Sequence, residues 1–167
     1  MTKLMAIRHA DASDEIISNV IATKSQAWSY PYESQQVWIA NNLSDNDLHV
    51  FLYEDEKIEA YLNLIDITPV VNGIPIKAYG IGNVCSCTKR MGYGNKLMKL
   101  TNDYLKMVQR AGLLFCHEHV EPFYAKCGWT KIGNHLCRIS GLTPEIKVYA
   151  YLLPHSIESL LYDGKLF

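Results

Sequence analysis

The chain has 167 residues, of which 49% are hydrophobic and 20% charged, and its formal net charge is -1. This composition is that of a globular domain and excludes a disordered chain, which has few apolar residues and a large net charge. Sixteen basic residues are balanced by 17 acidic ones, so the charge does not favour nucleic acid or an anionic membrane as the main partner. No apolar run reaches the roughly 18 residues of a transmembrane helix.

The sequence predicts one cytoplasmic domain that spans residues 1–167. No internal repeat, low-complexity tract or Ser/Gly/Pro-rich linker marks a domain boundary, and Met1–Arg8 lacks the apolar stretch of a secretory signal. The five cysteines are an odd number without disulfide-framework spacing, so we expect them to be reduced and mostly buried. They are Cys85, Cys87, Cys116, Cys127 and Cys137.

The first half of the chain predicts two helices and a hairpin. Ile16 and Val20 recur at helical spacing after polar residues that can cap a helix. A second helix is expected to bury Val37, Trp38 and Leu43. The elements predicted here are a strand at Leu4–Arg8, a helix after Ser13, a helix at Glu33–Leu43, and strands at Leu48–Tyr53 and Ile58–Ile67.

In the second half, an Asn-Gly turn at Asn72 and Gly73 is expected to return the chain into a third long strand. A helix follows that strand, and Gly112 is expected to stop this helix. The predicted elements are strands at Ile76–Cys87, Leu113–Cys116, Trp129–Ile139 and Lys147–Leu153, and helices at Gly92–Arg110, Val120–Cys127 and Ser156–Leu161. This order predicts an α/β fold, in which a central, mostly antiparallel mixed sheet carries helices on both faces.

The turn that opens the long helix carries a pattern suited to phosphate binding. The first N–H groups of a helix have no intrahelical acceptor and lie at its positive dipole end, so they can hold a pyrophosphate. Gly92 and Gly94 allow close approach, and Lys89 and Arg90 add positive charge. The same pattern also fits a helix start that binds no phosphate and whose charged side chains are solvated. The run is Lys89-Arg90-Met91-Gly92-Tyr93-Gly94.

Two other classes of phosphate-binding protein are excluded by what the sequence lacks. A P-loop places Gly-Lys-Ser or Gly-Lys-Thr after its glycines, and neither occurs in this chain. Gly80-Ile81-Gly82 lacks the third glycine of a dinucleotide-binding fingerprint. Nucleotide hydrolysis and NAD binding are therefore not expected.

Two motifs in the right order resemble those of the GCN5-related N-acetyltransferase superfamily. Its acetyl-CoA signature is Gln or Arg, two residues, Gly, one residue, and Gly or Ala, and residues 89–94 fit this spacing with Lys in the first place. Leu113–His117 followed by Val120–Trp129 is similar to the superfamily's fifth strand and following helix, with a Tyr four residues before a Gly and an aromatic residue. In sequence detail the resemblance covers residues 80–97 and 113–129.

The resemblance implies a direct acyl transfer from acetyl-CoA. In this superfamily the fourth and fifth strands splay apart and pantetheine lies between them. It implies that the main chain of Val84, Cys85 and Ser86 contacts pantetheine and that Lys89–Gly94 bind the pyrophosphate. Tyr124 occupies the position of the general acid, where a protonated hydroxyl can donate to the departing thiolate. Its alternative role is that of a core aromatic residue.

Further roles stay open at this stage. His117 is expected to contact the cofactor or serve as a base, and Glu118, His119, Glu33 and a water chain are other candidates for the base. Tyr30, Tyr32, Glu33 and Glu118 are expected to contact the acceptor, and aromatic cover over the sheet is an equal alternative for the two tyrosines. The run from Cys116 to His119 lacks the second ligand pair of a zinc site, so no metal is expected.

The acceptor itself is expected to be a small-molecule primary amine. Two other functions remain: acetylation of a protein or peptide, and a non-catalytic acyl-CoA-binding sensory module. The resemblance is compatible with a homodimer, and neither nucleic acid nor a membrane is expected as a partner.

Overall fold

The computed structural model describes all residues from Met1 to Phe167, which form two compact units. Unit 1 comprises Met1–Ile65 and Asn83–Thr101, and unit 2 comprises Asp66–Gly82 and Asn102–Phe167. Because the chain crosses between them within β3 (Lys57–Ile67), β6 (Ala78–Ser86) and α3 (Tyr93–Met107), each of these elements contributes residues to both units. No helix is long and apolar enough to cross a membrane.

Unit 1 is built on a sheet with strand order β1-β2-β3-β6. Its other elements are β1 (Thr2–Arg8), a 3-10 turn (His9–Asp11), α1 (Asp14–Ser25), α2 (Tyr32–Asn42) and β2 (Leu48–Glu54). The β1–β2 and β2–β3 pairs are antiparallel. The predicted hairpin is therefore confirmed.

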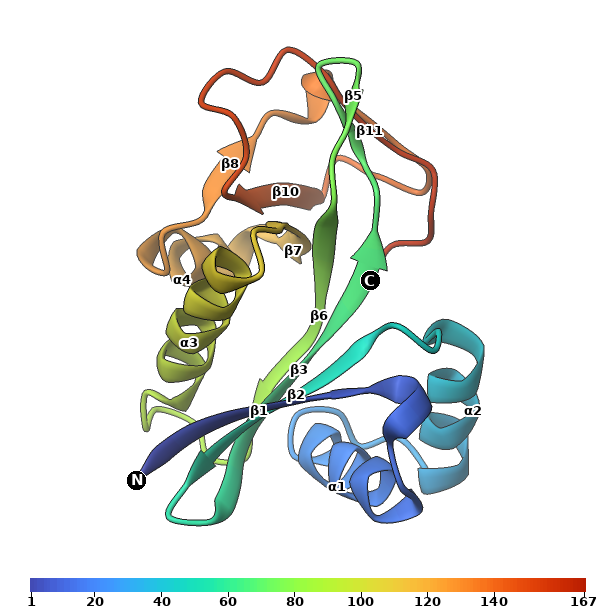
Figure 1. The fold of residues 1–167 in the computed structure, drawn as a ribbon, viewed down its shortest axis with the longest axis vertical. Coiled ribbons are helices and arrows are strands. Elements are labelled where there is room, and N and C mark those ends of the chain that lie inside the picture. Colours follow the sequence, from blue (N-terminus) through green and yellow to red (C-terminus); the bar gives the residue numbers. More distant parts are fainter. The chain divides into compact units, whose positions relative to one another are not determined.

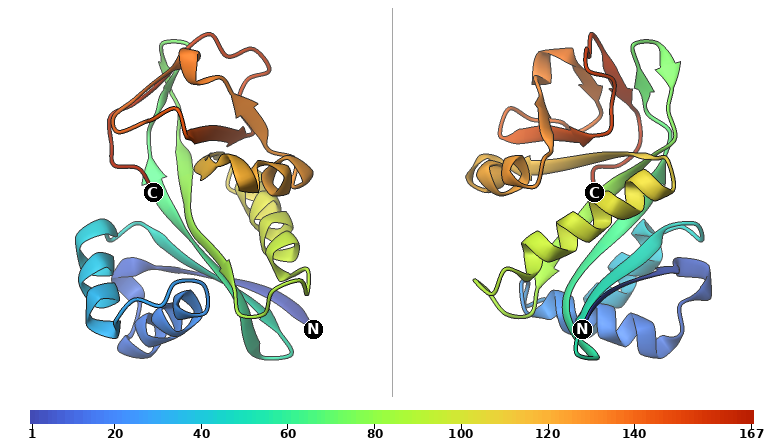
Figure 2. Two further views of the ribbon diagram at one scale, coloured as in Figure 1. Left: turned by 180° about the vertical axis from the view of Figure 1, so that it is seen from behind. Right: turned by 60° about the vertical axis from the view of Figure 1, so that its left-hand side comes forward.

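Both faces of this sheet are covered, as predicted. Every residue of β3 from Glu59 to Leu64 is buried, although neighbouring side chains of a strand point to opposite faces. On one face, Phe51 and Tyr61 pack in a core with Val20 and Ile21 of α1, where α1 and α2 lie side by side (Figure 1). The first half of α3 lies over the other face (Figure 2).

The prediction of which residues of α2 are buried is wrong. Val37 is 58% exposed, whereas Gln35 and Ile39 are buried, one turn apart. Leu43, which directly follows α2, is buried as expected. The buried face of α2 includes a polar residue, Gln35, whereas the spacing of the apolar residues predicted a different buried face.

Unit 2 contains the rest of the main sheet and a small second sheet. The parallel pairing of β6 with β7 and the antiparallel pairs of β7 with β10 and of β10 with β8 give the order β6-β7-β10-β8. The second sheet has the order β5-β4-β11-β9. The elements are β4 (Val70–Val71), β5 (Ile74–Pro75), β7 (Ala111–His117), a 3-10 turn (Glu118–Val120), α4 (Glu121–Lys126), β8 (Thr130–Ile132), a 3-10 turn (Asn134–Leu136), β9 (Cys137–Ile139), β10 (Ile146–Tyr151) and β11 (Leu160–Tyr162).

Three sequence predictions in unit 2 are wrong. Gly112 does not stop α3, because the helix ends at Met107, Gln109 takes a positive φ of 54°, and Gly112 lies inside β7. The strand predicted at Trp129–Ile139 is two short strands separated by a 3-10 turn. The closing helix predicted at Ser156–Leu161 does not form, and its last residues belong to β11.

Asn72 holds the segment that stands in place of that helix. Its side-chain Oδ1 accepts hydrogen bonds from the main-chain N–H groups of Glu158 (2.7 Å) and Ser159 (3.1 Å), and its Nδ2 donates to the carbonyl of Ser156 (2.8 Å). The strand β11 pairs with β4 and with β9, so its main-chain groups are not available for helical hydrogen bonds. Asn72 and Gly73 also have the positive φ angles, 49° and 80°, of the predicted turn.

We expect Asn72→Ala to lower the free energy of unfolding by about 1–3 kcal/mol, because three hydrogen bonds are lost. Urea denaturation followed by circular dichroism measures the loss. Asn72→Gly is the control, because it tolerates a positive φ but makes none of the three bonds. If the loss arises from the hydrogen bonds, the two variants will be similarly destabilised, and a Gly variant as stable as the parent chain would contradict this account.

Candidate functional site

The turn between β6 and α3, in unit 1, leads into the start of a long helix. The main-chain N–H of Lys96 donates to the carbonyl of Gly92 (3.0 Å), so the first helical hydrogen bond ends on Gly92. Arg90 and Gly92 have φ angles of 65° and 77°, and no atom lies within 4 Å of the position a Cβ would take on Gly92. The N–H groups at the start of α3 therefore have no acceptor within the helix.

The charges at this turn are uncompensated. Lys89 and Arg90 are exposed, and neither makes an ion pair. Lys96, one turn into the helix, is instead held by Glu54 at 2.8 Å between its Nζ and Oε2. Met91 is 59% exposed, and Tyr93 is half-buried. Two cations without ion pairs beside the first N–H groups of a helix match the chemistry of a diphosphate.

The end of β6 is irregular in the way the cofactor hypothesis requires. The register between β6 and β7 ends at Ile81 and Leu114, although β6 continues to Ser86. Asn83, two residues further, has a φ of 53°, a left-handed conformation that interrupts the regular strand. The main chain from Val84 to Ser86 thus follows a break in the regular strand.

The thiol of Cys85 is buried and does not face solvent. Its side chain is buried in the core with Val20 and Ile21 of α1, and its Sγ lies 4.0 Å from the carbonyl of Thr23. Burial raises the pKa of the Cys85 thiol to about 12, so the sulfur is protonated and inert near neutral pH. Val84 and Ser86 are half-buried, and the Ser86 hydroxyl donates to the carbonyl of Thr88 (3.3 Å).

Tyr124 lies in unit 2, on α4. Its ring packs edge-on against Phe123, with 5.0 Å between centroids, and against Tyr149 at 6.5 Å. Burial is the main cause that raises the pKa of Tyr124 well above its usual value, and the nearby thiols of Cys116 and Cys127 act in the same direction. The hydroxyl is therefore protonated throughout the physiological pH range. No protein group accepts a hydrogen bond from it, so it is free to donate to a ligand.

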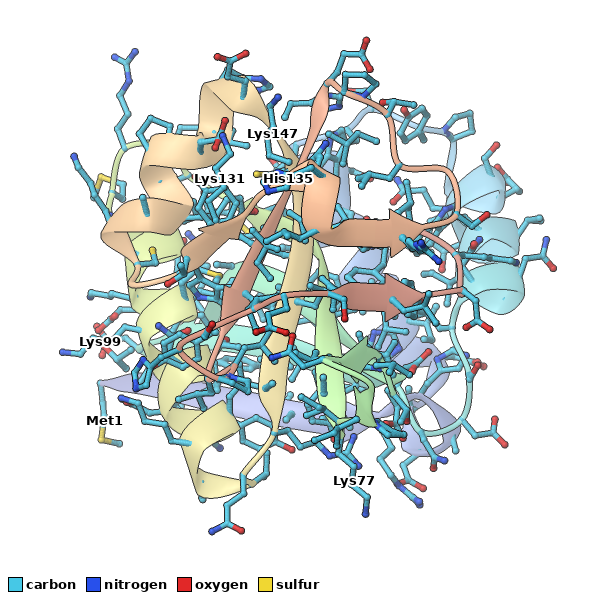
Figure 3. All side chains as sticks on the ribbon, turned by 90° about the horizontal axis from the view of Figure 1, so that it is seen from above. Met1, Lys77, Lys99, Lys131, His135 and Lys147 are labelled. Atoms are coloured by element: carbon cyan, nitrogen blue, oxygen red, sulfur yellow. The ribbon has the colours of Figure 1, made fainter.

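The surroundings of Tyr124 are held by an ion pair. Glu121, at the start of α4, accepts a hydrogen bond from the Tyr149 hydroxyl (2.7 Å) and pairs with Lys131 (2.9 Å). The Tyr149 hydrogen bond is the main cause that lowers the pKa of Glu121. Lys131 and Lys147, both labelled in Figure 3, lie on the adjacent strands β8 and β10. This network ties α4 to the sheet of unit 2.

His117 and Glu118 lie together at the end of β7, as candidates for the base. Both are exposed, and the ring of His117 stacks on that of His119 with 6.1 Å between centroids. They line a shallow hollow of about 820 Å³ in unit 2, with Glu145 and Lys147 on its other side. No group of three or more His, Cys, Asp or Glu side chains could hold a metal ion.

The segment predicted to contact the acceptor contributes only in part to a pocket of unit 1. Tyr30 lines this pocket, of about 400 Å³. Tyr32 does not, because it begins α2 and its hydroxyl shares a hydrogen bond with Ser18 Oγ (3.0 Å). Glu33 is exposed in the first turn of α2 and does not line the pocket either. We call this cavity the aromatic pocket; it is lined by Lys24, Trp28, Tyr30, Ser34, Gln35, Trp38 and Asn83.

Sequence reasoning missed Lys24, Gln35 and Asn83. A signal existed for Lys24, because it stands four residues after Val20 and three after Ile21 and so shares their buried helical face. Gln35 and Asn83 carry no such signal. A polar residue in a helix and an Asn inside an apolar strand are both common in solvated positions.

Comparison with known proteins gives structural likeness without close sequence relatives. The sequence matches no protein-family profile and no curated protein at a significant level. Many solved structures do match. An acyl-CoA N-acyltransferase from Pseudomonas aeruginosa is 17% identical with a TM-score of 0.63, covering 90% of this chain and 99% of its own. The ribosomal-protein-S18-alanine N-acetyltransferase from Escherichia coli is 14% identical with a TM-score of 0.63, over 100% of both chains. A GCN5-related N-acetyltransferase from Anabaena variabilis is 16% identical with a TM-score of 0.63, over 78% of this chain and 33% of its own.

Proposed function

We propose that this chain, which has the fold of the GCN5-related N-acetyltransferases, is an acetyl-CoA-dependent N-acetyltransferase that acts on a small-molecule primary amine. The observation that carries the proposal is the start of α3, where Lys89 and Arg90 are free of ion pairs. A 15-residue helix with uncompensated cations beside its first N–H groups is suited to a diphosphate such as that of coenzyme A.

The end of β6 is proposed to bind the pantetheine arm. Because Cys85 directs its side chain into the core, its contribution is limited to the main chain. Main-chain groups of Val84 and Ser86 would bond the amides of the arm as a neighbouring strand does. An N–H in this stretch would stabilise the negative charge that develops on the thioester oxygen.

In the proposed reaction the acceptor nitrogen attacks the thioester carbonyl, so that an N–C bond forms and the C–S bond breaks. Tyr124 donates its hydroxyl proton to the departing sulfur. The proton of the acceptor amine passes to a base, for which His117 and Glu118 are the candidates in unit 2. The raised pKa of Tyr124 keeps its hydroxyl protonated, so a proton is present on it at neutral pH.

The cytoplasm is the proposed location. None of the five cysteines forms a disulfide, as in proteins of reducing compartments. Burial raises the pKa of each of them above that of a solvated thiol.

The proposal is tested by thiol release from acetyl-CoA in the presence of single amines, with the acetylated product identified by mass spectrometry. The panel covers amino acids, polyamines, aminoglycosides and peptides. Acetylation of a small amine supports the proposal, whereas acetylation of peptides alone would move the function to a protein acceptor. Tight binding of acetyl-CoA without transfer to any acceptor would indicate a non-catalytic acyl-CoA-binding module.

Replacing Lys89 and Arg90 together with Gln is expected to weaken coenzyme A binding by about tenfold or more, because two charge-assisted contacts to phosphate are lost. Isothermal titration with coenzyme A measures the change. Lys99→Gln is the matched control, since Lys99 is an exposed lysine of the same helix beyond its first turn. Unchanged affinity in the double variant would remove this turn from the binding site.

A further inference from the structure

The aromatic pocket contains a buried cation without a counter-charge. Lys24 is 6% exposed, and its Nζ lies 4.1 Å from the centroid of the Trp38 ring. It makes no ion pair, and none of the residues that line the pocket is acidic. A buried charge is costly unless it is paired, so the pocket is electrostatically complementary to an anion.

The groups around Lys24 do not supply that anion. The titratable side chains that interact with it are Cys85 and His49. Burial raises the pKa of Cys85 to about 12 and lowers that of His49 to about 4, so both are neutral at pH 7. His49 is in turn bonded to Tyr61, with 2.8 Å between Nδ1 and the hydroxyl. The positive charge of Lys24 therefore remains for a ligand.

The same pocket offers an unpaired hydrogen-bond acceptor. Gln35 is 3% exposed, and its Nε2 donates to Ser25 Oγ (2.9 Å) and to the carbonyl of Tyr30 (3.2 Å). These two bonds fix the orientation of the amide, and its Oε1 is left buried without a partner. A buried acceptor without a donor costs free energy, so a ligand that places an N–H group there is favoured.

The walls of the pocket are aromatic. Trp28 and Trp38 are each 37% exposed and Tyr30 is 66% exposed, although large apolar side chains are usually buried. All three line one small cavity, whose volume of about 400 Å³ lies near the lower end of the range for small-molecule sites. Such a pocket suits a flat or bulky apolar group of amino-acid size.

We propose that the acceptor is an aromatic or large aliphatic α-amino acid, whose carboxylate binds Lys24, whose amino group donates to Gln35 Oε1, and whose side chain lies between Trp28, Tyr30 and Trp38. This inference rests on the proposed function and names its substrate class. Asn83, which also lines the pocket, directly precedes Val84 on β6, so the pocket adjoins the stretch proposed to bind pantetheine. The positive charge of Lys24 also disfavours polyamines and aminoglycosides, and it lowers the pKa of a nearby substrate ammonium, which helps to form the neutral nucleophile.

The experiment compares four acceptors with acetyl-CoA: L-phenylalanine, phenylethylamine without the carboxylate, L-alanine without the ring, and spermidine. We expect kcat/KM to be highest for L-phenylalanine, by about tenfold or more over each of the others. Lys24→Met should raise KM for L-phenylalanine about tenfold or more and leave that for phenylethylamine nearly unchanged. Lys99→Met is the matched control, because Lys99 is exposed on α3.

If Lys24→Met does not fold, Trp38→Leu tests the same pocket. This substitution should raise KM for L-phenylalanine more than KM for L-alanine. Spermidine as the best acceptor would overturn the inference while leaving acetyl transfer intact. A Lys24→Met variant in which KM rises equally for L-phenylalanine and phenylethylamine would do the same. Calorimetric titration separates the two proposals. Binding of L-phenylalanine that depends on Lys24 but leads to no acetylation would support the pocket and overturn the catalytic function.

Discussion

Tyr124→Phe is expected to lower the turnover of acetyl transfer by about 10²–10⁴-fold, the usual contribution of a general acid. The substitution removes one hydroxyl from a ring that packs between Phe123 and Tyr149, and no protein group bonds that hydroxyl. The fold and the affinity for coenzyme A should therefore be unchanged. Steady-state rates of thiol release and titration with coenzyme A measure the two quantities separately.

Tyr149→Phe is the matched control for this substitution. Its hydroxyl is already bonded to Glu121 at 2.7 Å, so its loss should reduce stability rather than turnover. Burial raises the pKa of Tyr124, so its proton stays bound above the ordinary tyrosine value of about 10, and the acid should remain active up to that pH. A Tyr124→Phe variant with the turnover of the parent chain would remove Tyr124 from the chemistry.

Trp129→Ala is expected to lower the free energy of unfolding by about 3–5 kcal/mol, a large share of the about 5–15 kcal/mol that holds a domain folded. Trp129 is 3% exposed, its ring stacks on Tyr151 at 5.5 Å, and its Nε1 donates to Asn102 Oδ1 at 2.9 Å. Asn102 in turn donates to the carbonyl of Cys127 (2.8 Å), directly after α4. Urea denaturation measures the loss.

A double-mutant cycle with Gly112 tests this packing. A Cβ on Gly112 would lie 2.3 Å from the Trp129 ring, so Gly112→Ala alone is expected to destabilise the chain. With Trp129→Ala in place the ring is gone, and Gly112→Ala should cost much less, because substitutions at contacting residues are not additive. Additive losses would show that the ring does not rest on Gly112.

The sequence predicted most elements of the fold because their patterns are local. The Asn72-Gly73 turn, the β2–β3 hairpin and the start of α3 each depend on residues close in the chain. The predicted helix at Ser156–Leu161 failed because its last residues pair in a sheet with β4 and β9, which are distant in the sequence. Gly112 was misassigned because its small size serves the distant Trp129 rather than a local turn.

The candidate site likewise has one part that the sequence indicated and one part that only the structure shows. The basic turn at Lys89–Gly92 is contiguous in sequence, and its spacing alone indicated phosphate chemistry. The aromatic pocket brings together α1, the segment before α2, α2 itself and β6, and only folding shows that Lys24 lacks a carboxylate. A charged residue on a buried helical face remains the sequence feature that could have indicated it.

The small sheet of unit 2 pairs strands that are distant in the sequence, and this affects the order in which the sheet can form. Its strands β4 and β11 pair Val71 with Leu160 and Val70 with Leu161, and β9 reaches the sheet only through β11. During synthesis, β4 can pair at once with β5, but its second partner, β11, follows only almost ninety residues later, and contacts so distant along the chain form slowly. Until β11 arrives, one edge of β4 has no strand beside it.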